Sequence, residues 1–422
     1  MFVVLGNTWA LMLGMMLLMV GNGLQGTLIG IRGELEGFST IELSVVMSAY
    51  FVGFLGASRL VPELIRRVGH VRVFAALASF ISAVLIAYPL LANPIFWSLG
   101  RVIIGFCYCG VYITAESWLN NSVNNDKRGQ ALSLYMIVQM IGIVSAQGVL
   151  AVGNPNGYSL FIIISILVSI SFAPILLSVS PTPAFERTKP MSLAQLFRSS
   201  PLGCVGMFLL GGVFSAQFGM SAVFGSQIGL SLSKISLFVA AFYIGAMIFQ
   251  YPIGWMSDRM DRRLLILLIS ASSAGGSVFA YFAGDYFFAL VFAAFLVGGL
   301  SNPLYSLIIA HANDFIEYED MASAAAGLLF VNGIGAISGP LIIGYAMNAF
   351  GPEIFFVIIF LLMSTLAAYA GYRMTQRATV SDTSVYAAVL PNSTGVAVEI
   401  AQEYAFEIAN EDDEKKVMHK SH

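Results

Sequence analysis

One arginine inside an apolar stretch carries the strongest chemical signal in this sequence. Arg101 lies about six residues inside an apolar run at 95–118, where an unpaired charge costs at least ~2.5 kcal/mol if the run crosses a bilayer. On a helix, four further residues share its face: Gly105, Tyr108, Tyr112 and Glu116. A polar and aromatic face of this kind is expected to line a water-filled cavity. Arg101 then anchors an anionic ligand group or modulates a coupled proton; alternatively, it is a structural residue bound to backbone carbonyls between helices.

Amide side chains at matched positions extend this candidate cavity. Asn22 and Gln25 lie on one helical face of the first apolar run. Gln25 corresponds to Gln217 in an internal repeat, so we expect the two to face each other. Because an amide both donates and accepts hydrogen bonds, such residues suit sugar hydroxyls, carboxylates or polar head groups. The alternative is a hydrogen bond between helices, typically worth ~0.6 kcal/mol. The predicted substrate contacts are Asn22, Gln25, Arg101, Tyr108, Tyr112, Gln139, Gln217, Tyr305 and Asn332.

Other apparent motifs carry no chemistry. The run 21–26 matches G-x-G-x-x-G, but it lies inside an apolar helix with no preceding strand and is a packing feature, not a dinucleotide site. Cys107 and Cys109 lie in an apolar run without other ligand types around them and are interpreted as small apolar residues. The sequence contains no Walker loop and no nucleophile–base arrangement. We therefore expect no enzyme, cofactor or metal site, and the scarcity of charge excludes a nucleic-acid binder.

The composition places the chain in a membrane. Of 422 residues, 58% are hydrophobic and only 10% are charged, whereas soluble domains are about a quarter charged. A helix needs about 20 mainly apolar residues to cross a bilayer. The sequence predicts an all-α membrane protein with twelve transmembrane helices, at 8–31, 41–61, 72–92, 95–118, 129–152, 158–179, 203–225, 235–256, 264–284, 286–310, 322–347 and 353–374.

The distribution of Lys and Arg predicts the orientation. Twelve spans place fourteen basic residues on one side of the membrane and only Arg32 and Lys234 on the other. The basic side is expected to be cytoplasmic, with both termini there. The tail from residue 375 onward carries eight acidic and four basic residues and is interpreted as a mobile appendage or, alternatively, as a partner-binding segment. One loop on the basic side is instead acidic, with Asp314, Glu317, Glu319 and Asp320.

The sequence contains one long internal repeat. A shift of 192 or 193 residues superposes Gln25 and Gln217, Gly53 and Gly245, Gly105 and Gly298, Tyr112 and Tyr305, and Gln139 and Asn332. We infer a duplicated six-helix unit, which is typical of transporters with a site between the halves near the bilayer midplane. The expected parts are an N-terminal bundle (1–180), a cytoplasmic linker (181–200), a C-terminal bundle (201–374) and an acidic cytoplasmic tail (375–422).

A charged loop after the eighth span carries a family resemblance. The segment 254–263 reads GWMSDRMDRR and resembles the G-x-x-x-D-R-x-G-R-R loop of the major facilitator superfamily, with Asp261 in place of the last glycine. Arg101-x-x-x-Gly105 resembles a second motif of that family. The run 116–120, ESWLN, is similar to a bacterial branch whose substrates are mostly unassigned. The resemblance covers residues 1–374 and implies two pseudo-symmetric six-helix bundles.

Charged residues at the basic helix ends are candidates for a gate. Opposite charges there can hold one helix against another until the bundle rocks. We expect Asp258 to pair with Arg259, and Glu116 to pair with a basic residue of the first-half loop, a degenerate match to the same motif. The alternative is that the basic residues only fix topology. The predicted gating residues are Glu63, Arg66, Arg67, Glu116, Asp258 and Arg259.

Together these features predict a secondary or facilitative transporter in a bacterial inner membrane. It moves a small organic solute, with an anionic solute as one option, by alternating access. Two alternatives stay open: an exporter of amphipathic compounds, favoured by the cavity tyrosines, and a transporter-derived sensor that signals through its tail. No Asp or Glu lies near the predicted midplane, so both proton coupling and facilitated diffusion remain options. The expected partners are a small-molecule substrate, protons in the coupled case and the lipid bilayer, and the expected state is a monomer.

Introduced cysteines test the orientation. Cysteines placed beside Arg187 and Arg377 should be protected from an impermeant thiol reagent in intact cells, because both positions lie on the predicted cytoplasmic side. A cysteine beside Lys234, on the predicted outer side, is the control that should react. Labelling of both protected positions from outside would overturn the orientation.

Overall fold

The computed structural model describes residues 2–122, 127–174, 191–283, 286–376 and 386–405, and every regular element within these ranges is a helix. Helices satisfy each backbone N–H and C=O internally, as a hydrocarbon environment requires. The N-terminal half contains α1 (Phe2–Leu35), α2 (Thr40–Val68), α3 (His70–Ala87), the short η1 (Tyr88–Leu90), α4 (Pro94–Ser122), α5 (Arg128–Val152) and α6 (Ser159–Ser171). After α8 (Leu193–Ser199), the C-terminal half contains α9 (Pro201–Ser215), the π-helical turn η3 (Ala216–Met220), α10 (Ser221–Gln227), α11 (Leu232–Ser257), α12 (Arg262–Ala283), α13 (Phe287–Ser301), α14 (Pro303–Asn313), α15 (Tyr318–Phe350) and α16 (Ile354–Gln376).

Within the described residues, eleven helical stretches are long and apolar enough to cross a membrane. Two of them contain a break: α9, η3 and α10 form the span Pro201–Gln227, and α13 and α14 form Phe287–Asn313. The sixth predicted span corresponds to α6, which is shorter, with 13 residues; residues 175–179 of that prediction lie outside the described ranges. The predicted all-α multi-pass membrane fold is confirmed.

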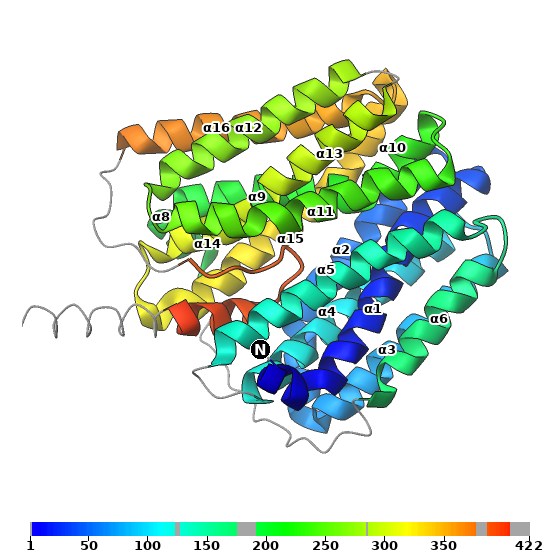
Figure 1. Ribbon diagram of the computed structural model, residues 1–422, viewed down its shortest axis with the longest axis horizontal. Coiled ribbons are helices and arrows are strands. Elements are labelled where there is room, and N and C mark those ends of the chain that lie inside the picture. Colours follow the sequence, from blue (N-terminus) through cyan, green and yellow to red (C-terminus); the bar gives the residue numbers. More distant parts are fainter. Residues whose placement is uncertain (1, 123–126, 175–190, 284–285, 377–385, 406–422) are drawn as a thin grey trace, which may run out of the picture.

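The chain forms two bundles that lie side by side (Figure 1). Equivalent helices pack in the same way in both, because α2 against α4 is matched by α11 against α13, and α1 against α5 by α9 against α15. The contacts between the bundles are paired as well, since α2 meets α15 and α5 meets α11. This arrangement is the pseudo-twofold relation that the repeat predicts.

Residues matched by the repeat have matched local structure. Gly37 and Gly229 both have a positive φ, 82° and 76°, a conformation that glycine adopts without steric cost. Each is followed two residues later by the N-cap serine of the next helix, Ser39 for α2 and Ser231 for α11, with ψ of 159° and 158°. The duplication therefore preserves one turn in two copies.

Glycine allows the paired helices to approach closely. A Cβ on Gly53 of α2 would lie 1.9 Å from a backbone oxygen of α4, and a Cβ on Gly105 of α4 would lie 1.9 Å from a backbone oxygen of α2. The equivalent residues Gly245 and Gly298 give 2.1 Å and 2.3 Å between α11 and α13. Small residues at membrane helix interfaces permit this backbone-to-backbone packing. Each half is therefore held together by a glycine-dependent helix pair.

The two ends of the molecule differ in how the halves meet. We call the end that carries Arg66, Arg128 and Arg262 the basic end, and the other the opposite end. At the opposite end the halves bond directly: Gln227 Nε2 donates to Thr40 Oγ1 (2.6 Å), and Ser233 Oγ donates to the carbonyl of Ala151 (3.2 Å). The halves are therefore closed against each other at the opposite end.

The linker between the halves is described from residue 191 of its predicted range, 181–200. This part includes α8, whose N-cap Ser192 accepts from the backbone N–H of Gln195 (3.2 Å). Leu196 of α8 is buried and packs on Gly327 of α15, where a Cβ would lie 2.7 Å from the leucine side chain. The described part of the linker is thus anchored to the second half.

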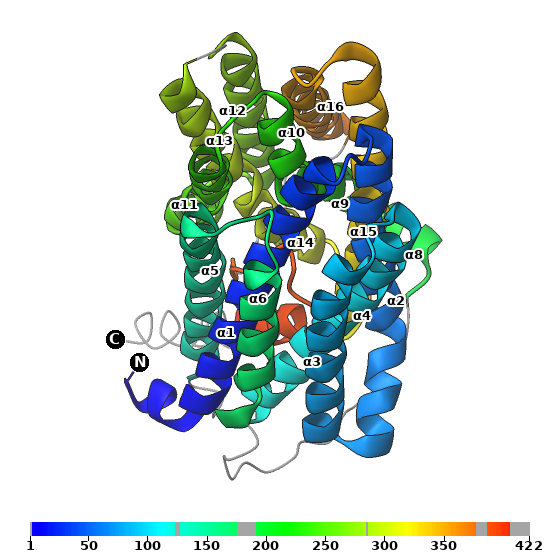
Figure 2. The ribbon, with the colours of Figure 1, turned by 90° about the vertical axis from the view of Figure 1, so that its right-hand side faces the viewer.

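A C-terminal segment lies between the two halves at the basic end (Figure 2). Residues 386–405, the tail segment, contain a turn closed by the Ser393 N–H on the Leu390 carbonyl (2.9 Å) and a helix at 395–405. The buried apolar side chains of the segment are Val389, Leu390, Ala397, Val398, Ile400, Ala401 and Ala405. The expectation of a mobile appendage is therefore wrong for this segment; residues 377–385 and 406–422 of the predicted tail lie outside the described ranges.

The glycine contacts predict where a single methyl group destabilises the fold. Gly53→Ala and Gly245→Ala should each cost about 1–3 kcal/mol, because the new Cβ overlaps a backbone oxygen that cannot move alone. Gly56→Ala, on the same helix as Gly53 but with nothing within 4 Å of its Cβ position, is the matched control. Thermal unfolding of the purified proteins measures the effect. An unchanged melting temperature for Gly53→Ala and Gly245→Ala would contradict the packing argument.

Candidate functional site

A cavity of about 120 Å³, the central cavity, lies between the halves at mid-length of the spans. The first half contributes α1, α2, α4 and α5 to its wall, and the second half contributes α9, η3, α11 and α15. Aromatic rings form much of the wall: Tyr50, Phe51, Phe54, Phe214, Phe218 and Tyr243. The polar lining residues are Asn22, Gln25, Thr27, Ser58, Arg101, Asn302, Asn332 and Asn392. The last of these belongs to the tail segment, which therefore reaches the cavity.

Arg101 is the one charged residue among the described residues that line the central cavity. It is 3% exposed, and its Nη1 donates to Gln25 Oε1 (2.5 Å). The guanidinium lies 4.7 Å from the ring centroid of Tyr50, and Nη2 lies 3.6 Å from Met47 Sδ. Its Nε has no hydrogen-bond partner, and it forms no ion pair with a described acidic residue. The Gln25 amide and the face of the Tyr50 ring therefore surround this cation in place of a counter-charge.

A chain of hydrogen bonds leads away from Arg101 along the first half. Gln25 accepts from Arg101 and donates through Nε2 to Asn22 Oδ1 (3.0 Å). Asn22 then donates through Nδ2 to the hydroxyl of Tyr112 (2.9 Å). Because each amide is polarised by the donor before it, the chain distributes the field of the buried charge along α1 and α4. The chain also fixes the orientation of both amides at the cavity wall.

The second half presents an amide pair at two helix breaks. Gln217 lies in the π-helical turn η3 and accepts through Oε1 from Asn302 Nδ2 (3.0 Å), while its Nε2 donates to Ser301 Oγ (2.7 Å). Asn302 immediately precedes Pro303, where α13 ends and α14 begins. Irregular turns of this kind inside membrane helices are frequent at functional sites. The Oδ1 of Asn302, on the cavity wall, has no partner.

The structure sorts the predicted substrate contacts into two sets. Four line the central cavity: Asn22, Gln25, Arg101 and Asn332. Five are buried behind its wall: Tyr108, Tyr112, Gln139, Gln217 and Tyr305. Gln217 thus bonds within its own half and does not face Gln25 across the cavity. The roles of all nine in binding stay predictions.

Asn302, Tyr50 and Tyr243 are among the lining residues that were missed at the sequence level. Asn302 had a usable signal, because an asparagine before a proline within an apolar run marks a helix break whose backbone needs polar partners. Tyr50 and Tyr243 had none, since a tyrosine in an apolar helix packs against lipid or protein as readily as against a cavity. Their positions follow from helix rotation, which the apolar pattern of these spans leaves undetermined.

Some charged residues of the basic end pair with residues close to them in the sequence. Glu63 accepts from Arg66 (2.7 Å) and from Arg67 (2.8 Å), all three at the end of α2. Asp261 accepts from Arg263 (2.9 Å). Burial acts to raise the pKa of Asp261, but the hydrogen bonds from Arg263 outweigh it and hold that pKa below its ordinary value.

Asp258 and Arg259 do not pair with each other, contrary to the prediction. Asp258 accepts from the backbone N–H of Tyr386 in the tail segment (2.9 Å) and lies 3.9 Å from Arg262. Arg259 instead stacks on Trp255, 4.3 Å from its ring centroid. We call the charged segment 254–263 the motif loop. Its acidic residue Asp258 therefore contacts the tail segment.

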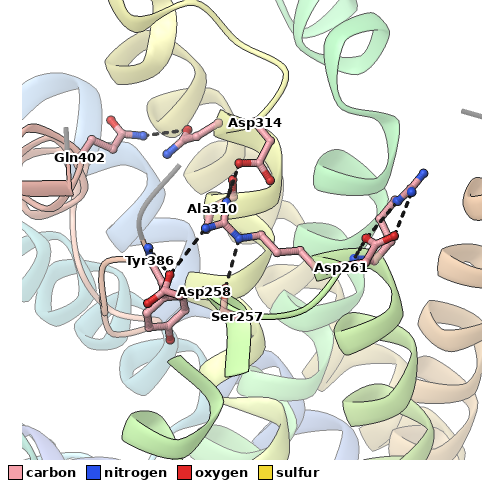
Figure 3. Close-up of polar contacts among 10 residues, drawn as sticks. Ser257, Asp258, Asp261, Ala310, Asp314, Tyr386 and Gln402 are labelled. Carbon is pink, nitrogen blue, oxygen red and sulfur yellow. Dashed lines mark hydrogen bonds and ion pairs between the residues drawn. The ribbon is translucent and has the colours of Figure 1, made fainter. Parts of the chain in front are cut away.

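A buried ion pair joins the motif loop to α14 (Figure 3). Arg262 donates to Asp314 (2.5 Å), to the carbonyl of Ala310 (3.1 Å) and to Ser257 Oγ (3.1 Å). The side chains of Arg262 and Asp314 are only 1% and 4% exposed. Asp314 belongs to the acidic loop that departs from the basic pattern of its side. Its role as a buried counter-charge explains why this loop contains an acid.

Glu116 has a different partner from the predicted one. It is fully buried at the basic end of α4, whereas Arg66 and Arg67 are exposed at the end of α2 and bond to Glu63. Its carboxylate accepts from the backbone N–H of Thr394 (3.2 Å) and from the Thr394 hydroxyl. The prediction that Glu116 pairs with the first-half loop is therefore wrong, because the tail segment occupies this position.

Comparisons with known proteins agree with this architecture. Residues 11–238 and 202–385 match the family described as Major Facilitator Superfamily. The chain is 26% identical over 373 residues to the uncharacterized MFS-type transporter YcaD of Escherichia coli O17:K52:H18 (strain UMN026 / ExPEC), covering 86% of this chain and 95% of the relative. A crystal structure of a mutant of the nucleoside transporter NupG has a TM-score of 0.73, with 16% identity, over 87% of this chain and 100% of that one. A bacterial homolog of the human lysosomal transporter Spinster, in an inward-facing and unoccupied conformation, has a TM-score of 0.67, with 16% identity, over 96% of both chains.

Breaking the Arg262–Asp314 ion pair should destabilise the folded protein strongly. Asp314→Asn removes the counter-charge of a buried guanidinium, and breaking such a pair from one side costs about 3–5 kcal/mol. Asp320→Asn, at an exposed acid near the start of α15, is the matched control and should be neutral. Thermal unfolding in detergent compares the two. A parent-like melting temperature for Asp314→Asn would show that the pair contributes little.

Proposed function

The chain belongs to the major facilitator superfamily, and on that premise we propose that this solute transporter carries a small organic anion by alternating access. The central cavity holds the solute, and the two six-helix halves rock about it to open one end at a time. The membrane is the bacterial inner membrane, and the basic end is cytoplasmic by the distribution of Lys and Arg.

The observation that carries the substrate class is the buried charge of Arg101. A cation at mid-membrane is costly unless water, a counter-charge or polar groups surround it. The described cavity wall contains no carboxylate, and Arg101 retains an unpartnered Nε beside the cavity. An anionic group of the solute supplies the missing counter-charge. A guanidinium suits a carboxylate because its planar set of donors matches two oxygens.

The rest of the wall supports a solute that is part polar and part apolar. Amides of Asn22, Asn302 and Asn332 offer donors and acceptors, and the rings of Tyr50 and Phe218 offer flat apolar surfaces. The likeness to a nucleoside transporter extends to the fold, at 16% identity. The substrate class therefore rests on Arg101 and not on that likeness.

The state of the two ends supports alternating access. The opposite end is closed by direct bonds between the halves, such as Gln227 to Thr40 and Ser48 Oγ to the carbonyl of Ile337 (2.6 Å). At the basic end the tail segment separates the two halves and bonds to both. With the basic end cytoplasmic, this is an inward-facing arrangement of the bundles.

Substitutions of Arg101 test the anionic substrate. Arg101→Ala should weaken binding of the best organic acid about a hundredfold, since a hydrogen bond to a charged group contributes up to about 3 kcal/mol. Arg101→Lys should also bind more weakly, because a point charge cannot replace the planar donor set. Gln25→Ala should weaken the same ligand only about fivefold, as one neutral hydrogen bond implies. Titration calorimetry on the purified proteins measures all three.

Arg32→Lys is the control for the exchange of arginine for lysine. Arg32 pairs with Glu36 near the opposite end and lies away from the cavity wall, so its variant should bind as the parent does. A folded Arg101→Ala protein that binds and transports like the parent would show that Arg101 is structural. The anionic substrate would then be abandoned.

A further inference from the structure

We propose that the tail segment, residues 386–405, is a plug built into the chain: it fills the basic end between the halves, is held by Glu116, and leaves before that end closes. The inference rests on the proposed route of the solute through the central cavity. The segment lies between the halves at the basic end (Figure 2).

The tail segment is bonded to both halves. On the first half, Glu403 pairs with Arg128, Thr394 bonds to Glu116, and Asn392 Nδ2 donates to Gln139 Oε1 (3.2 Å). On the second half, Val389 exchanges two bonds with Ser306 Oγ (2.8 and 2.9 Å), Gln402 donates to Asn313 (3.0 Å), and Tyr386 donates to Asp258 (2.9 Å; Figure 3). Movement of one half relative to the other therefore breaks one of these two sets.

Two tyrosines of the segment occupy places left open by glycine, one in each half. A Cβ on Gly129 of α5 would lie 2.2 Å from the ring of Tyr404, and a Cβ on Gly254 of α11 would lie 2.7 Å from the ring of Tyr386. Gly254 is also the first residue of the motif loop, whose Asp258 bonds to the segment. The halves thus offer a surface fitted to this segment.

The segment also limits the size of the central cavity. Its turn at 390–393 places Pro391 and Asn392 in the cavity wall. The cavity measures about 120 Å³, whereas sites for small organic ligands usually measure about 300–1,000 Å³. Withdrawal of the turn removes this part of the wall and opens the site toward the basic end. The docked segment is therefore incompatible with loading of a solute from that end.

Glu116 and the segment stabilise each other. The carboxyl group is fully buried and accepts hydrogen bonds from the N–H and the hydroxyl of Thr394. Thr394 is the N-cap of the helix at 395–405, since its carbonyl accepts from the Val398 N–H (3.2 Å), and the positive end of a helix dipole favours an adjacent anion. Without the segment, the carboxylate faces the open space between the halves. Removing the carboxyl group should therefore release the segment.

The reaction rate of a cysteine on the cavity wall tests the proposal in the full chain. Leu329→Cys is the reporter, because Leu329 lines the cavity and is 8% exposed. The protein is placed in lipid nanodiscs and treated with an impermeant maleimide, and labelling of the reporter peptide is followed by mass spectrometry. Adding Glu116→Ala should raise the rate about tenfold, because the segment loses its hydrogen bonds to that carboxyl group. Adding Gly129→Ala should raise the rate as well, because the new methyl group displaces Tyr404.

Matched controls separate release of the segment from general loosening. Glu317→Ala removes an exposed carboxyl group at the start of α15, and Gly148→Ala adds a methyl group on α5 with nothing within 4 Å; both should label at the parent rate. If Glu116→Ala fails to fold, Gly129→Ala decides the question alone. Folded variants that label at the parent rate overturn the plug. The assay needs no solute, so this result would leave the proposed transport function standing, just as a failure of the Arg101 binding test would leave the plug standing.

Discussion

The buried charge of Arg101 constrains which side chains can surround it at the centre of the structure. A guanidinium at mid-membrane requires polar surroundings, and here they are Gln25, the face of Tyr50 and the hydrogen-bond chain through Asn22 to Tyr112. None of these partners is an anion, so the cavity wall keeps its positive charge. The site is pre-organised on helices, and under the proposed function an anionic solute supplies the counter-charge of Arg101.

The two halves and the tail segment contribute different kinds of contact to the structure. Glycine-packed pairs, such as Gly53 with Gly105, hold each half together as a unit, and the buried Arg262–Asp314 pair fixes the motif loop to its own half. The opposite end is closed by direct contacts, whereas at the basic end the tail segment supplies contacts to both halves. The motif loop therefore serves two partners, because Arg262 bonds within its half and Asp258 bonds to the tail segment.

Much of the fold followed from the sequence, and much of the site did not. Apolar run length and the repeat predicted the helices and their pseudosymmetry because both depend on local patterns. The rotation of each helix does not, so Gln217 was placed on the cavity wall although it bonds within its half to Asn302. The partner of Glu116 was missed for a different reason. The polar composition of the tail indicated no packing, whereas its apolar residues, Leu390 and Ile400 among them, are buried because the halves form a fitted surface for them.

The central claim, an anion bound beside Arg101, is tested most directly by thermal stability of the full-length protein with matched pairs of ligands. Each pair is an organic acid and its carboxamide, equal in shape and different in charge, and a ligand that binds the folded state stabilises it by RT ln(1 + [L]/Kd). The account predicts that at least one acid raises the melting temperature while its amide does not. Stabilisation by amides, neutral sugars or cationic dyes alone, with no acid active, would contradict it.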